Sequence, residues 1–109
     1  MTELEALNKQ KEENKLLMQY RDMVARLYEN PDFKSLVLDY WCNTECARYA
    51  QVSGDPNIPE QNRKDALAMA QAAGHFKRFL NVVTLMGNRA EAEMEELEQA
   101  VIDASVNEE

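Results

Sequence analysis

Hydrophobic residues recur every three or four positions through most of the chain, which is the spacing of amphipathic helices. In the segment 2–29, Leu4 and Leu7 share a helical face, but the same face continues with the polar Lys11 and Asn14. The apolar stripe returns farther along, at Leu17, Tyr20, Val24 and Leu27. This pattern predicts one helix over 2–29, with a first half that projects or pairs weakly and a second half that docks.

A helix of that length spans about 40 Å at 1.5 Å per residue, more than a 109-residue globule comfortably covers. Long amphipathic helices on a small body favour association with further copies. We therefore expect a homo-oligomer whose self-association residues are Leu17, Tyr20, Val24 and Leu27.

A helical hairpin is predicted over 31–86. Asn30 and Pro31 end the first helix and are well suited to cap the next one, which extends to about Gln51. Its expected apolar face consists of Phe33, Leu36, Val37, Tyr40, Trp41 and Ala47. A loop rich in turn-forming residues follows at 53–59. A third helix then begins at about Pro59 and carries apolar positions including Ala73, Phe76, Leu80, Val83 and Met86.

Two glycines stand in or near this third helix. A glycine inside a helix lowers its stability by about 1 kcal/mol relative to Ala. We therefore expect a packing reason for Gly74, such as an aromatic side chain lying over it. Gly87 followed by Asn88 can end a helix in the left-handed conformation, or can be absorbed into one continuous helix. The segment 88–109 is therefore expected to be a separate acidic helix or the end of a longer one. Its apolar stripe is thin: Met94, Leu97, Val101 and Ala104.

The net charge of −8 is concentrated at one end of the sequence. Residues 1–89 contain 12 acidic and 12 basic side chains, whereas 90–109 contain eight acids and no Lys or Arg. Among these acids, Glu91, Glu95 and Glu98 share a helical face and are expected to bind a basic partner. Because the body is neutral and the last segment repels phosphate, nucleic-acid binding is unfavourable.

Candidate chemistry is sparse. Cys42 and Cys46 lie four apart on a predicted helix, in poor geometry for a disulfide, and are expected to be reduced, packed thiols. With His75 they could offer three ligands to zinc, but structural zinc sites usually take four. We therefore expect no metal, no cofactor, no catalytic residues and no enzyme activity. No apolar run reaches the roughly 18–20 residues that span a bilayer, and no signal peptide is apparent.

The sequence is thus expected to form a single all-α domain over 1–109, a small helical bundle. It comprises an extended N-terminal helix (2–29), a central helical hairpin (31–86) and an acidic C-terminal helix (88–109).

One stretch, over about 27–83, resembles small helical proteins encoded in the structural gene clusters of tailed bacteriophages. The residues that carry this resemblance are the helix cap 30–34, Leu36, 39–40, 45–48, 63–65, 73–75 and 79–80. An acidic rather than basic C-terminal segment distinguishes this sequence from typical scaffolding proteins. The resemblance transfers no binding residues.

The resemblance implies a virion or assembly accessory protein that acts through helix–helix and self-association contacts. The protein would associate with further copies of itself and with other phage structural proteins. It would act in the host cytoplasm during assembly, and whether it is retained in the virion is left open. The alternative is a small phage inhibitor that binds a host protein, with the acidic helix imitating the charge of DNA.

Overall fold

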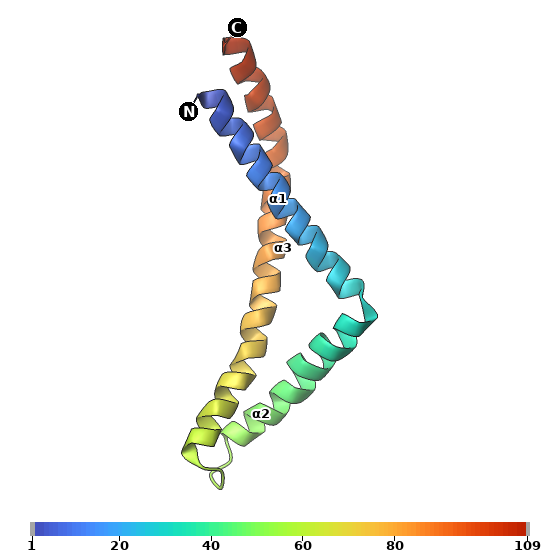
Figure 1. The fold of residues 1–109 in the computed structure, drawn as a ribbon, viewed down its shortest axis with the longest axis vertical. Coiled ribbons are helices and arrows are strands. Elements are labelled where there is room, and N and C mark those ends of the chain that lie inside the picture. The colour runs from blue at the N-terminus through green and yellow to red at the C-terminus, as the bar shows by residue number, and fades with distance from the viewer. Residues whose placement is uncertain (1, 109) are drawn as a thin grey trace. The chain divides into compact units, whose positions relative to one another are not determined.

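The computed structural model describes residues 2–108, and these residues are almost entirely helical (Figure 1). In chain order the elements are α1 (Glu3–Glu29), η1 (Phe33–Glu45), α2 (Cys46–Ser53) and α3 (Glu60–Glu108). No strand occurs within this range, so the predicted all-α class is confirmed.

The chain divides into two compact units. We call Met1–Val24 with Val82–Glu109 the terminal unit, and Ala25–Asn81 the central unit. The long helices α1 and α3 each contribute to both units. All net charge belongs to the terminal unit, because the central unit holds seven acidic and seven basic side chains.

Side-chain caps mark the starts of the first two helical segments. Thr2 Oγ1 accepts a hydrogen bond from the Glu5 N–H at 3.1 Å, which caps α1. Asn30 Oδ1 accepts hydrogen bonds from the N–H groups of Asp32 (2.9 Å) and Phe33 (3.0 Å). Asn30 therefore separates α1 from the next helical segment, as its type and position predict.

The second helical segment is not the uniform α-helix that we predicted. Residues 33–45 form the π-helix η1, and the N–H of Cys46 still bonds to the carbonyl of Trp41 five residues back. This wider turn places residues four or five apart on one face, so Phe33, Val37, Cys42 and Cys46 turn inward. Leu36 and Tyr40, each three residues beyond an inward position, are 66% and 51% exposed.

The central unit forms a helical hairpin in which η1 and α2 pack against the first part of α3. The Phe76 ring lies 5.5 Å from that of Trp41 and 6.4 Å from that of Phe33 between centroids. The Cys46 thiol donates a hydrogen bond to the carbonyl of Ala70 at 3.3 Å. The predicted pairing of these two segments is therefore correct, although the predicted face Leu36, Tyr40 and Ala47 is wrong.

Helix α3 continues without interruption through Gly87 and Asn88. The predicted boundary between a hairpin ending at 86 and a separate helix from 88 is therefore absent, and Glu109 lies outside the described residues. The buried positions of α3 repeat every seven residues: first Ala66, Ala73, Leu80 and Gly87, then Ala90, Leu97 and Ala104. This is the periodicity of a coiled coil, and most of these residues are small.

At Gly87, α1 and α3 approach each other closely within the terminal unit. A Cβ atom at this position would overlap the Cβ of Arg21 and would lie 2.9 Å from the carbonyl oxygen of Leu17. Gly87 is therefore needed for close approach and does not act as a helix terminator. By contrast, a Cβ at Gly74 would meet no atom within 4 Å, so the packing reason predicted for Gly74 is wrong.

The two glycines make a matched test of this packing. We expect Gly87→Ala to destabilise the protein by about 1–3 kcal/mol, because the added methyl overpacks the contact with α1. Gly74→Ala should stabilise it by about 0.5–1 kcal/mol, through helix propensity alone. Urea unfolding at one fixed protein concentration measures both. A Gly87→Ala variant as stable as Gly74→Ala would show that α1 does not contact α3 at Gly87.

Candidate interaction surfaces

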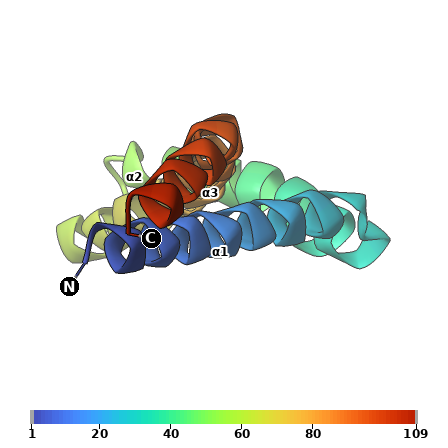
Figure 2. The same ribbon diagram turned by 90° about the horizontal axis from the view of Figure 1, so that it is seen from above.

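The contact between α1 and α3 in the terminal unit includes a buried amide. Asn14 is 7% exposed, and its Nδ2 donates hydrogen bonds to the carbonyl of Ala90 (3.5 Å) and to Glu93 Oε2 (3.3 Å). Figures 1 and 2 show the two helices side by side in this region. The polar first half of α1, which we expected to project or pair weakly, thus packs on α3. A buried Asn in such a contact favours one register over others.

Arg21 makes the main polar contact between the two helices. Its Nη1 donates to Glu91 Oε2 at 2.9 Å, to Asn88 Oδ1 at 3.3 Å and to the Gly87 carbonyl at 3.4 Å. The hydrogen bond that Arg21 donates to the Glu91 carboxylate raises the pKa of Arg21, so the guanidinium stays charged. The side chain is only 15% exposed, because it lies across the surface of α3 beside Gly87.

The predicted acidic face is divided by this arrangement. Glu91 is engaged with Arg21 inside the same chain. Glu95 and Glu98 are exposed, and neither forms an ion pair with any residue in the described range 2–108. Of the three predicted residues, Glu95 and Glu98 therefore carry carboxylates without an ion-pair partner among residues 2–108.

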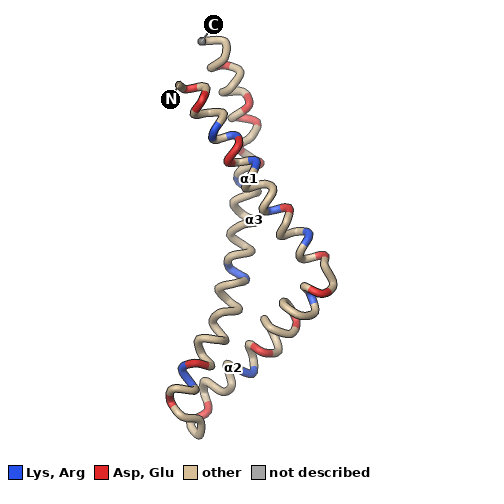
Figure 3. The backbone as a smooth tube through the Cα atoms, in the orientation of Figure 1, with Lys and Arg blue, Asp and Glu red and all other residues tan. Residues whose placement is uncertain are grey.

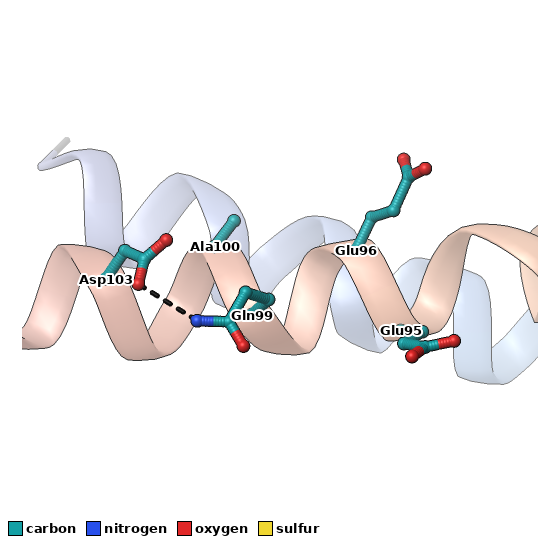
Figure 4. A pocket seen from close by; sticks show the side chains of 5 residues that line it. All are labelled: Glu95, Glu96, Gln99, Ala100 and Asp103. Atoms are coloured by element: carbon teal, nitrogen blue, oxygen red, sulfur yellow. Dashed lines mark hydrogen bonds between the residues drawn. The ribbon is translucent and has the colours of Figure 1, made fainter.

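Glu95, but not Glu98, borders a shallow, open hollow on α3. It is lined by Glu95, Glu96, Gln99, Ala100 and Asp103, and Gln99 donates a hydrogen bond to Asp103 at 3.0 Å (Figure 4). Figure 3 shows the acidic positions along this part of α3. All five lining residues come from one helix, so the hollow is a feature of a helix surface and does not enclose a ligand.

The predicted self-association residues are divided as well. Val24 is 6% exposed and Leu17 is half-buried, whereas Tyr20 and Leu27 are exposed. Val24 is therefore covered by its own chain. The exposed apolar positions of α1 form a different stripe at spacings of four, three and four: Leu16, Tyr20, Met23 and Leu27.

A second set of exposed apolar residues lies on α3, and our sequence analysis did not single it out. In the terminal unit this set comprises Val82, Leu85, Met86, Ile102 and Val106. We had assigned Met86 to the core of a hairpin. The signal that could have identified the set is the heptad of small residues, because a helix that buries Ala and Gly leaves its larger side chains on the opposite face.

The possible zinc ligands do not form a site. Cys42 is buried, Cys46 bonds to a carbonyl, and His75 is exposed. Within the described range, no group of three His, Cys, Asp or Glu side chains could hold a metal ion. The two cysteines are free thiols.

No helix among residues 2–108 is long and apolar enough to cross a membrane. Comparisons with protein-family models, with curated proteins and with solved structures found no match.

Replacing Arg21 tests the polar contact between the helices. We expect Arg21→Gln to lower the Tm by several degrees, because three acceptors on α3 lose a charged donor. Lys15→Gln is the control, since Lys15 pairs only with the exposed Glu12 on its own helix. Thermal unfolding followed by circular dichroism compares them. Equal Tm values would contradict the structural role assigned to Arg21.

The two thiols should differ in reactivity. Burial raises the pKa of Cys42, which lowers its thiolate fraction, and it also blocks access to the sulfur. We expect iodoacetamide to modify Cys46 well before Cys42, with Cys42 reacting mainly after unfolding. Peptide mass spectrometry over a time course gives both rates. Faster modification of Cys42 would contradict the packing of η1 on α3.

Proposed function

We propose that this protein is a non-enzymatic assembly protein that acts through helix–helix contacts, with further copies of itself among its partners. Within that class, we propose a virion or assembly accessory protein of a tailed bacteriophage.

One observation carries the first part of the proposal. Among the residues whose side chains the structure describes, the buried apolar side chains larger than Cys are only Val24, Leu80 and Leu97, whereas fifteen large apolar side chains are more than a third exposed. Contiguous exposed apolar surface marks sites of protein interaction. Most of these exposed residues lie on α1 and α3, as expected for long helices that pack against other helices.

The phage assignment is supported by the resemblance over about 27–83, which includes the Asn30 cap and the hairpin of the central unit. Under this proposal the protein works in the host cytoplasm during assembly, beside other structural proteins, and no cofactor is required.

A second candidate function is inhibition of a host protein by charge mimicry. It is supported by the exposed carboxylates of Glu95, Glu96 and Glu98, which lie on a segment without Lys or Arg after Arg89. Such an inhibitor should be monomeric, absent from phage particles, and bound to one host protein in a salt-sensitive complex.

The test combines two measurements on the unmodified protein. We expect light scattering of the isolated chain to give a defined oligomer, and mass spectrometry of particles from infected cells to detect it in many copies. An oligomer that is absent from mature particles would indicate an assembly role that ends before maturation. A monomer at all concentrations that is also absent from particles would overturn the proposal and favour the inhibitor.

A further inference from the structure

The side of α3 that faces away from α1 carries one continuous stripe in the terminal unit. Counting from Val82, its positions advance by alternating steps of three and four residues, which keeps them on one helical face. The buried heptad positions, including Gly87, Ala90 and Leu97, lie on the opposite face. We call this stripe, from Val82 to Val106, the outer face of α3.

The two ends of the outer face differ in charge. The first end carries Val82 and Leu85, both exposed, followed by Arg89, the last basic residue of the sequence. The second end carries carboxylates at Glu96 and Asp103, followed by Val106, which is 64% exposed. Between them lies the small, exposed Ala92. Each end thus combines apolar side chains with one sign of charge.

This gradient of charge makes the outer face complementary to itself in one orientation. The geometry points to a second copy of this chain as its occupant, packed antiparallel along α3 about a two-fold axis near residues 92–96. Val82 of one copy then faces Val106 of the other. Arg89 of each copy lies within reach of Glu96 of the other, which gives two equivalent ion pairs.

The opposite orientation is disfavoured by the same charges. In a parallel pair in register, Arg89 would face Arg89 and Glu96 would face Glu96, and such like-charge contacts are costly. A two-fold antiparallel contact also closes on itself, so it yields a dimer and not an open filament. The small Ala92 near the axis permits close approach of the two helices.

This inference rests on the proposed self-association, and it names the surface that performs it. This surface differs from the residues predicted from the sequence, because Val24 is buried and Leu17 is half-buried within their own chain. The remaining stripe on α1, with Leu16, Tyr20 and Met23, is the competing surface.

Charge reversal tests the contact. We expect R89E alone, or E96R alone, to weaken dimerisation by about tenfold or more, since each variant replaces two attractive pairs by two repulsive ones. The double variant R89E/E96R should restore dimerisation. Mixing the two single variants should also restore it, because both pairs in the heterodimer then join opposite charges. E98R, which makes the same charge change off the outer face, should dimerise like the unmodified chain.

Sedimentation equilibrium gives the dissociation constants, and circular dichroism verifies that each variant is folded. Should a reversal variant unfold, R89Q and E96Q replace it and should weaken dimerisation severalfold. If R89E and E96R do not weaken dimerisation, or if mixing them does not restore it, the outer face of α3 is not the dimer contact. If Tyr20→Ser abolishes dimerisation and the charge reversals do not, the contact lies on α1, and the proposed function stands. An unmodified chain that is monomeric throughout would overturn both.

Discussion

The close approach of α1 to α3 at Gly87 is the constraint on which the terminal unit depends. The backbone of α1 at Leu17 and the stem of Arg21 occupy the space that a side chain at position 87 would need. Arg21 can therefore lie flat across α3 and bond to Gly87, Asn88 and Glu91. The same closeness brings Asn14 to Ala90 and fixes which residues of the two helices meet.

A contact made of small residues determines what remains outside. Because α3 buries mainly Ala and Gly at its heptad positions, its larger apolar side chains occupy other faces and stay in contact with water. Two paired helices cannot enclose a core of large side chains, and the described residues contain no large side chain that is completely buried. The apolar surface that a compact monomer would bury is left available, which is why we propose a role in assembly.

Local rules predicted the fold class, the Asn30 cap and the pairing of the hairpin, since these depend on residues close in sequence. The π-helical backbone of η1 was not predictable, because the inward and outward positions of Leu36 and Tyr40 depend on hydrogen bonding that their residue types do not specify. Whether the helix continues through Gly87 stayed open and the packing reason expected for Gly74 was wrong, because the neighbour of a helical glycine can belong to another helix. For the same reason, Val24 and Tyr20 looked equivalent within α1, although Val24 is buried and Tyr20 is exposed.

We propose that the outer face of α3 binds a second copy in antiparallel orientation. The most direct test measures the distance between identical nitroxide side chains on two copies, placed at residue 92 or, in a separate sample, at residue 82. In the antiparallel pair, the two labels at residue 82 should lie about 36 Å apart along the helix axis, against about 6 Å for residue 92. Equal distances for the two positions, or no dipolar coupling at residue 92, would contradict the account.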